Sequence, residues 1–359
     1  MMSVRVPIGV AGCITPWNFP MAIPSWKVIP ALVTGNTVVL KPSPEAPLSS
    51  VNFVRALQDA GLPDGVLNLI TGTAVEVGAT LVDHPDVAII SFTGSTDTGR
   101  KINSNAAARL KRVSLEMGGK NAIIIMDDAD LQLAVDGAIW GGFGTTGQRC
   151  TAASRVLVHE KVHDAFLRDF VTRAKALRVG NGLDPQTEMG PLVSQTQLAK
   201  VERYVGIGKE EGAVIECGGN RLTGASLDRG FFYAPTIFSG VQRKMRVARE
   251  EIFGPVVSVI RVKNAEEAFD ICNDTEYGLS SSIYTRSVNL AFAAMRDLNT
   301  GITYINSPTI GAEVHLPFGG TKNTGNGHRE GGPTVIDLFT EWKTLYVDFS
   351  GRLQKAQID

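Results

Sequence analysis

One cysteine and one glutamate stand out because each lies in a glycine-rich segment with the composition of a tight turn. Cys150 lies in GQRCTA (147–152), and Glu116 lies in LEMGGK (115–120). Small residues around a thiol let a substrate approach closely, and a thiolate attacks carbonyl carbon readily. A carboxylate beside the resulting thioester can take a proton from water. The two residues therefore predict a thiol nucleophile and a general base that act in one site.

Each of these residues also has an ordinary structural interpretation. A cysteine taken alone is more often a buried, unreactive side chain, and Glu116 at a strand end is equally compatible with a loop charge of normal pKa. Four further motifs add weight because they appear in a fixed order around the pair: PWNFP (16–20), KPSPE (41–45), FTGS (92–95) and EEIFGP (250–255).

Together these segments resemble the NAD(P)-dependent aldehyde dehydrogenase superfamily, from about Pro7 to the C-terminal end. The resemblance implies that Cys150 attacks an aldehyde to give a thiohemiacetal, and that the Asn18 amide and the Cys150 backbone N–H stabilise the oxyanion. Hydride then passes to the nicotinamide, and Glu116 activates the water that hydrolyses the thioester. Lys120 matches a lysine near the active site of the family, to which we assign no role.

The cofactor site is predicted from a different turn than the usual dinucleotide fingerprint, because no GxGxxG follows the first predicted strand. Residues 92–99 instead place two glycines and small hydroxyl residues where helix N-terminal amides can receive a pyrophosphate, although a capped helix without ligand has the same pattern. By resemblance, Lys41 and Glu45 contact the adenosine ribose, and the Glu45 carboxylate repels a 2′-phosphate, which favours NAD over NADP. The expected cofactor-binding residues are Thr15, Pro16, Trp17, Lys41, Ser43, Glu45, Gly78, Phe92, Thr93, Gly94, Ser95, Thr98, Gly118, Glu251 and Phe253.

The elements that must position these residues alternate between strands and helices, which predicts an α/β fold. Short apolar runs at 10–14, 37–40, 66–70, 88–92 and 113–115 indicate buried strands of a parallel, doubly wound sheet. A second α/β region begins near Lys120, with expected strands at 122–126, 256–261, 282–285 and 302–306, helices at 131–144 and 162–177, and a last strand at 341–349. We therefore expect a cofactor domain (1–118), a catalytic domain (119–332) and a C-terminal oligomerisation tail (333–359).

Composition narrows the function classes. The chain has 359 residues, 43% of them hydrophobic, and a formal net charge of −1. These values give no basic surface for nucleic acid or for an anionic membrane, and no apolar run is long enough to span a bilayer. The four cysteines lack CxxC spacing and the five histidines are scattered, so neither a disulfide scaffold nor a metal site is predicted. We expect a cytoplasmic protein that forms a homodimer or homotetramer through edge pairing of the tail strand.

Three alternative functions remain open at this stage. An acylating enzyme would transfer the thioester to coenzyme A, although branches of the family with that chemistry generally lack the glutamate that matches Glu116. A thiol hydrolase would need a histidine partner that the sequence does not show near Cys150. A shortened, catalytically impaired member with a binding or assembly role is the third, because the N-terminal segment usual in the family is absent from this sequence. The aldehyde is not identified, and Arg149, Arg155 and His315 are candidate anchors for its far end.

Overall fold

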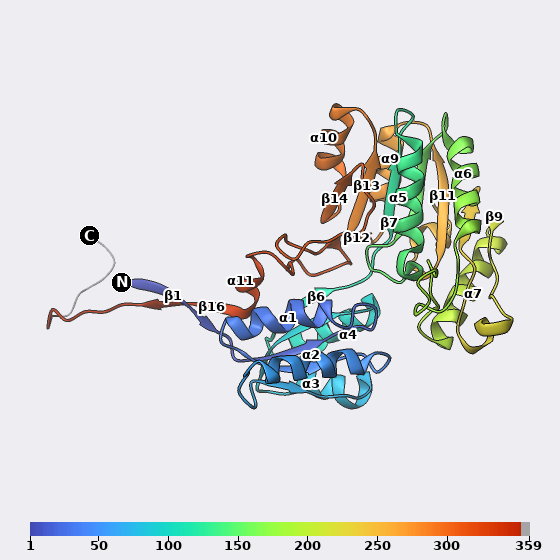
Figure 1. The fold of residues 1–359 in the computed structure, drawn as a ribbon. Coiled ribbons are helices and arrows are strands. Elements are labelled where there is room, and N and C mark those ends of the chain that lie inside the picture. Colours follow the sequence, from blue (N-terminus) through green and yellow to red (C-terminus); the bar gives the residue numbers. More distant parts are fainter. Residues whose placement is uncertain (353–359) are drawn as a thin grey trace.

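The computed structural model describes residues 1–352, which form two large sheets and a two-stranded ribbon (Figure 1). The end of the predicted tail, 353–359, lies outside the described residues. Among the described residues, no helix combines the length and apolar character needed to cross a membrane. The α/β architecture with parallel sheets confirms the predicted fold class.

The first sheet has five parallel strands in the spatial order β4-β3-β2-β5-β6. Each lies within one residue of the predicted apolar run or inside it, because parallel strands covered on both faces need near-continuous apolar sequence. Their bounds are β2 Val10–Ile14, β3 Thr37–Lys41, β4 Leu67–Leu69, β5 Val87–Thr93 and β6 Arg112–Glu116.

Helices cover both faces of this sheet, as expected for a doubly wound fold. On one face α1 (Ala22–Val33) and α2 (Pro47–Asp59) pack on the sheet with α11 (Val335–Phe339), which returns from the far end of the chain. On the other face lie η1 (Ala74–Gly78), α3 (Ala79–Asp83) and α4 (Thr96–Ala107). Side chains along β2 and β3 alternate between the two cores.

The second sheet has seven strands in the order β14-β13-β7-β8-β11-β10-β9, and only β9 is antiparallel to its neighbour. Four of these strands were predicted, and β8, β9 and β10 were not. Their bounds are β7 Asn121–Ile125, β8 Ala153–His159, β9 Val214–Cys217, β10 Thr236–Ser239, β11 Val256–Val262, β13 Ser280–Tyr284 and β14 Ile302–Ile305.

Helices also cover both faces of the second sheet. The helices α5 (Leu131–Phe143) and α6 (His163–Ala176) cover one face, and both were predicted. The other face carries α7 (Gln195–Glu210), α8 (Arg246–Arg249), α9 (Ala265–Asn273) and α10 (Val288–Asp297). Shorter elements are η2 (Gly144–Gly147), η3 (Ala225–Arg229) and the small pair of β12 (Tyr277–Gly278) with β15 (Thr321–Lys322).

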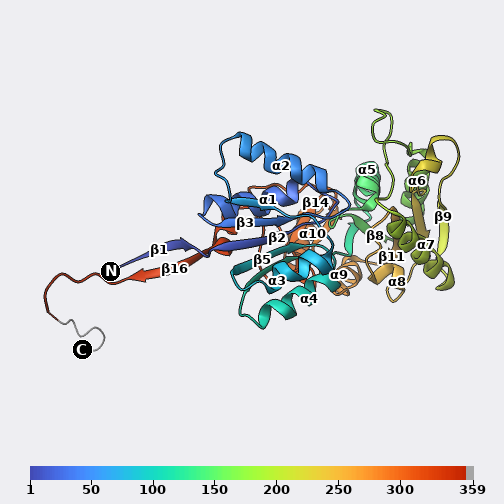
Figure 2. The same ribbon diagram turned by 90° about the horizontal axis from the view of Figure 1, so that it is seen from below.

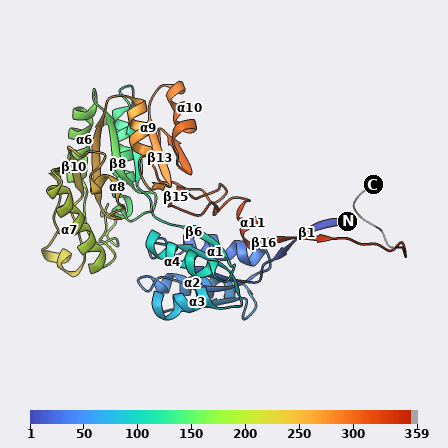
Figure 3. The ribbon, with the colours of Figure 1, turned by 180° about the vertical axis from the view of Figure 1, so that it is seen from behind.

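The ribbon is formed by the two ends of the described chain. Strand β1 (Met2–Pro7) pairs antiparallel with β16 (Thr340–Leu345), so that Arg5 lies opposite Trp342. The ribbon extends away from the first sheet in all three ribbon views (Figures 1, 2 and 3). The predicted last strand is thus present, but it begins one residue earlier and ends before Tyr346.

The chain passes between the two sheets in a short segment that directly follows β6. Glu116 is the last residue of β6, and Asn121 is the first residue of β7. The returning chain lies against this segment, because the backbone N–H of Met117 donates to the Thr324 carbonyl (2.7 Å) and Thr324 Oγ1 donates to the Gly118 carbonyl (2.9 Å). Glu116 is therefore held where the two sheets approach each other.

Candidate active site

The turn that carries Cys150 has an uncommon backbone conformation. Thr145 (φ 53°), Thr146 (φ 60°) and Gly147 (φ 65°) are consecutive left-handed residues, a conformation that costs a non-glycine residue roughly 1–2 kcal/mol. Thr146 Oγ1 donates to the Gly190 carbonyl (3.0 Å), and the Gln148 amide both donates to the Pro191 carbonyl (3.2 Å) and accepts from the Val193 N–H (3.0 Å). These bonds hold the turn that leads into Cys150.

Asn121 fixes the backbone on the other side of the nucleophile. Its Nδ2 donates to the carbonyls of Cys150 (2.7 Å) and Ala152 (2.9 Å), and its Oδ1 accepts from the Ser280 N–H (3.0 Å). The side chain is buried, and its amide uses both N–H donors and its carbonyl. Asn121 therefore ties the turn that carries Cys150 to β7 and β13, a role that sequence reasoning did not assign.

Cys150 lines two cavities, and a third adjoins the second of them. The first, of about 230 Å³, is lined by Cys150 and Glu116 together with aromatic residues. The second, of about 170 Å³, is also lined by Cys150, and it contains Asn18. The third, of about 670 Å³, adjoins the second through shared residues: Pro16, Trp17, Thr93, Gly94 and Ser95. The thiol thus lies between an aromatic chamber and a long groove along the edge of the first sheet.

Asn18 and Cys150 line the same cavity. Its Nδ2 donates to the Gln148 carbonyl at 3.1 Å, which leaves one of its two N–H groups for an oxyanion beside Cys150. Asn18 comes from the loop before α1, on the first sheet, whereas Cys150 comes from the second. The site is assembled from both sheets.

The electrostatics of the pair oppose ionisation of both groups. Glu116 is 2% exposed, and both of its carboxyl oxygens lack a hydrogen-bond partner within residues 1–352. Burial, with a smaller contribution from the Glu330 charge, raises the Glu116 pKa well above its usual range. Burial also raises the pKa of Cys150 to about 12, and the charges of Glu116 and Glu251 add to this shift. The thiol is therefore not a free thiolate at neutral pH in the ligand-free protein.

A buried ion pair lies beneath the aromatic chamber. Lys27 Nζ, on α1, donates to Glu330 Oε1 and to Ser91 Oγ (3.1 Å), and both charged side chains are almost fully buried. Glu330 lines the chamber with Glu116. The Glu330 carboxylate, neutralised by Lys27, therefore lies beside Glu116. Sequence reasoning missed this ion pair because its two residues are 303 positions apart.

The groove is lined by most of the residues that the sequence predicts to bind the cofactor. Every cofactor residue proposed from β2, β3, η1, β5 and the start of α4 lines the large cavity except Glu45, which is exposed on the adjoining loop. Thr15 Oγ1 and Thr93 Oγ1 are buried without a partner in the described chain, so the groove offers unused polar atoms. Lys41 Nζ contacts only the Pro42 carbonyl (3.1 Å) and is available to a ribose hydroxyl. These features match a polar, elongated ligand.

The nicotinamide end of the predicted site lies in the second cavity. Gly118, Glu251 and Phe253 line it together with Cys150. Glu251 Oε1 accepts the Gly119 N–H (3.0 Å), and the Phe253 ring meets Trp17 edge to face at 5.5 Å. Phe253 is itself left-handed (φ 61°) and its carbonyl accepts from Gln197 Nε2 (2.7 Å). Gln197 and Lys200 of α7 also line this cavity, and sequence reasoning missed both.

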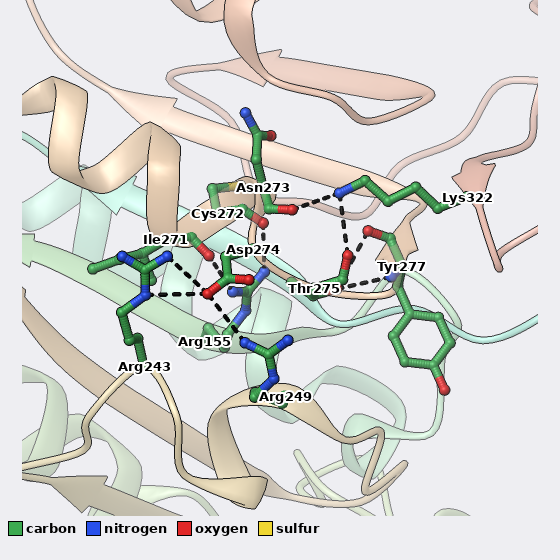
Figure 4. Close-up of polar contacts among 10 residues, drawn as sticks. All are labelled: Arg155, Arg243, Arg249, Ile271, Cys272, Asn273, Asp274, Thr275, Tyr277 and Lys322. Carbon is green, nitrogen blue, oxygen red and sulfur yellow. Dashed lines mark hydrogen bonds and ion pairs between the residues drawn. The ribbon is translucent and has the colours of Figure 1, made fainter.

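Lys120 and Arg155 have buried positions outside the cavities described above. Burial lowers the pKa of Lys120 to about 7, and its ammonium has no partner among residues 1–352. Arg155, a candidate substrate anchor, donates instead to the backbone carbonyls of Ile271 (2.7 Å) and Cys272 (3.0 Å), which Figure 4 shows. It also donates to the Lys120 carbonyl at 2.6 and 3.0 Å. It caps the end of α9 and does not face the chamber.

The groups near Arg155 form a wider structural network (Figure 4). Asp274 accepts from Arg243 (2.7 Å) and pairs with Arg249 (3.1 Å). Lys322 Nζ donates to the Asn273 carbonyl (2.6 Å) and the Thr275 carbonyl (3.2 Å). Cations thus satisfy the last carbonyls of α9, which is the arrangement that a helix C-terminus favours.

The fold and the site together define a class of protein. Cys150 and Glu116 line one aromatic chamber, and Cys150 also lines the cavity that adjoins the groove at the first sheet. The sequence profile described as the aldehyde dehydrogenase family matches residues 1–345. The chain belongs to this family, whose members oxidise aldehydes.

Relatives and solved structures agree with this assignment. The chain is 45% identical to betaine aldehyde dehydrogenase of Mesorhizobium japonicum and 43% identical to alpha-ketoglutaric semialdehyde dehydrogenase of Bacillus subtilis, covering 96% and 97% of this chain and 70% and 71% of those proteins. Betaine aldehyde dehydrogenase of Staphylococcus aureus in complex with NAD+ superposes with a TM-score of 0.93 at 40% identity, covering 95% of this chain and 67% of that one.

Proposed function

We propose that this protein oxidises an aldehyde to the free carboxylic acid, with NAD as hydride acceptor and Cys150 as nucleophile. The observation that carries the proposal is the position of Cys150, which lines both the aromatic chamber and the cavity that continues into the groove. An aldehyde bound in the chamber meets the thiol from one side. The residues of the groove and of the second cavity would hold a dinucleotide on the other side, and its nicotinamide would supply the hydride acceptor when bound.

The proton of Cys150 needs a base, because burial holds the thiol protonated. Glu116 lines the same chamber, and its raised pKa makes its carboxylate a stronger base than an exposed one. After the sulfur has attacked the carbonyl carbon, the oxyanion lies beside the free N–H of Asn18 and the backbone N–H of Cys150. Lys27 and Glu330 keep compensated charges next to Glu116 and act as positioning residues.

Glu116 also decides how the thioester is released. A carboxylate that opens into the chamber can accept a proton from water as its oxygen attacks the thioester carbon, which gives the free acid and returns the thiol. This supports hydrolysis over acyl transfer to coenzyme A. Acyl transfer to coenzyme A is the alternative reaction, because the groove proposed for the dinucleotide could also lead the thiol of coenzyme A to the thioester.

The test of this proposal is oxidation of an aldehyde panel with NAD, followed at the absorbance of NADH, with the product identified with and without coenzyme A. We expect NADH and the free acid in equal amounts, independent of coenzyme A. An acyl-coenzyme A product would replace the proposal with the acylating reaction. Protein that is folded and binds NAD but oxidises no aldehyde would favour the non-catalytic alternative, and ester turnover with no dependence on NAD would favour a thiol hydrolase.

Glu45 is proposed to favour NAD over NADP, although it is exposed and does not line the groove in the ligand-free protein. Its loop position, two residues after Ser43, lets the carboxylate turn toward the ribose hydroxyls. We expect Glu45→Gln to raise kcat/KM for NADP relative to NAD by about 3- to 30-fold, because it removes repulsion of the 2′-phosphate at moderate screening. Glu76→Gln, which changes an exposed carboxylate on η1, is the control, and an unchanged ratio in Glu45→Gln would contradict the assignment.

We further propose that the ribbon contacts another copy of the chain. Large apolar side chains on the ribbon and directly after it face solvent in the single chain: Trp342 of β16 is 65% exposed, and Tyr346, the residue that follows β16, is 71% exposed. An unpaired ribbon edge with exposed aromatic residues is a surface that pairing would cover. The expected assembly is a homodimer or homotetramer.

The proposed assembly predicts that the ribbon residues control the mass in solution. Replacing both Trp342 and Tyr346 with serine should shift the species measured by light scattering toward the monomer, because it removes apolar surface that the contact would bury. Leu183→Ser, at an exposed loop site in the catalytic region, is the matched control. An unchanged mass for the double variant would contradict a ribbon contact.

A further inference from the structure

Arg149 lines the aromatic chamber directly beside the nucleophile, and its charge has no carboxylate partner within residues 1–352. Its Nε donates to Thr145 Oγ1 at 2.8 Å. Its guanidinium carbon lies 5.6 Å from the centre of the Phe19 ring and 5.1 Å from that of Trp140. The Nε bond and the two rings fix the guanidinium, while its two terminal nitrogens keep their N–H groups free.

The other charges of the chamber do not compensate Arg149. Glu330 is paired with the fully buried Lys27, so that couple is neutral as a whole. Glu116 is desolvated, and its raised pKa favours the uncharged carboxyl form. Burial also disfavours the charged form of Arg149 and lowers its pKa, although a guanidinium stays protonated in proteins. The chamber therefore has an excess of one half-buried positive charge.

We propose that Arg149 is a substrate-binding residue that receives the distal carboxylate of a small acidic semialdehyde; the inference rests on the proposed aldehyde oxidation. The two free terminal nitrogens form a fork that matches both oxygens of a carboxylate. The methylene groups between the two ends of the substrate would lie against the aromatic walls of the chamber, Phe19, Trp26 and Phe318.

A cationic aldehyde is disfavoured by the same geometry. Aromatic walls alone would suit a quaternary ammonium group, and the chamber has such walls. A trimethylammonium group there would lie beside the guanidinium, and like charges at short range in a partly desolvated chamber repel each other strongly. The sign of the uncompensated charge, and not the aromatic lining, decides between the two substrate classes.

The test compares 5-oxopentanoate with its uncharged isostere 5-oxopentanamide, using the whole protein with NAD. We expect the wild-type chain to favour the acid by about 10- to 100-fold in kcat/KM, the range of a charge-assisted hydrogen bond. Arg149→Gln should bring this ratio to within about 3-fold of unity, and Arg149→Lys should give an intermediate value because a point charge lacks the fork. Betaine aldehyde should be oxidised more slowly than the amide.

The ratio is the readout because both substrates use the same thiol. Any effect of Arg149 on the reactivity of Cys150 cancels between them, whereas a merely structural role would lower both rates and leave the ratio unchanged. Arg168→Gln, at an exposed site on α6, is the control and should keep the wild-type ratio. Oxidation of both compounds at equal efficiency by the wild-type chain would overturn the inference while leaving aldehyde oxidation in place. Failure to oxidise any aldehyde would overturn both.

Discussion

Replacing Cys150 with alanine is expected to lower kcat/KM for aldehyde oxidation by about 10⁴-fold or more, because the substitution removes the atom that bonds to the substrate. NAD binding should stay within about 3-fold of the wild-type affinity, since the groove is lined by residues of the first sheet and loses no contact. Steady-state rates and calorimetric titration with NAD measure the two effects separately.

The control removes a different cysteine. Cys217→Ala deletes a buried thiol that donates to the Pro235 carbonyl (3.5 Å), and it should leave oxidation within about 2-fold of wild type. Iodoacetamide should label Cys150 first, because Cys150 is only partly buried and lines two cavities, whereas Cys13, Cys217 and Cys272 are buried. Turnover by Cys150→Ala at the wild-type rate, or inactivation that follows modification of another cysteine, would remove Cys150 from the mechanism.

The first sheet was the easier half to predict, for a physical reason. Its strands are covered on both faces, so each is a short apolar run bounded by turn residues. Strand β8 was missed because its sequence, ASRVLVH, contains Ser154, Arg155 and His159. Arg155 is tolerated there because backbone carbonyls from three residues satisfy its guanidinium. That compensation comes from segments distant in sequence.

Prediction of the candidate site had the same limit, because contacts between distant segments are not visible in a local sequence pattern. The rule that ligands bind beyond the carboxyl ends of parallel strands places Asn18, the groove turn and Glu116 correctly on the first sheet. Cys150, in contrast, precedes β8 and enters from the amino end of a strand of the second sheet. Motif resemblance, and not strand polarity, brought it into the predicted site. Side-chain direction was equally beyond the sequence, as the exposed Glu45 and the buried Arg155 show.

Buried polar partners from distant segments could not be predicted at all. Lys27 belongs to a helix whose pattern suggests only an apolar face, and Glu330 follows a turn near the far end of the chain. In the sequence, Asn121 is only the polar residue that begins an apolar strand, and nothing in that pattern indicates its hydrogen bonds. Their roles depend on which backbone and carboxyl groups the fold brings to them, which becomes visible only in three dimensions.

Glu116→Gln is expected to lower kcat by about 10²- to 10⁴-fold, the usual contribution of a positioned general base, and to let the Cys150 thioester accumulate. Because Glu116 must be ionised to act, and burial raises its pKa, the wild-type kcat should rise with pH through that raised pKa. The glutamine variant should lose this rising limb. Quenched reactions analysed by mass spectrometry would show the acyl group on Cys150, and pH–rate profiles would show the limb.

The same substitution should stabilise the ligand-free protein at alkaline pH. A group whose pKa is raised by folding contributes stability below its unfolded pKa and loses that contribution as pH rises through the folded pKa, because the desolvated carboxylate is then unfavourable. Among residues 1–352 the Glu116 carboxyl group has no hydrogen bond that would offset this cost, so Glu116→Gln should gain in denaturation midpoint relative to wild type as pH increases. The exposed Glu202→Gln should show no such pH-dependent gain. Suppose that Glu116→Gln loses the base activity but does not become more stable than wild type at alkaline pH. Glu116 would then be ionised and paired in solution. The assignment of a buried, uncharged carboxyl group as the resting form of the base would be wrong.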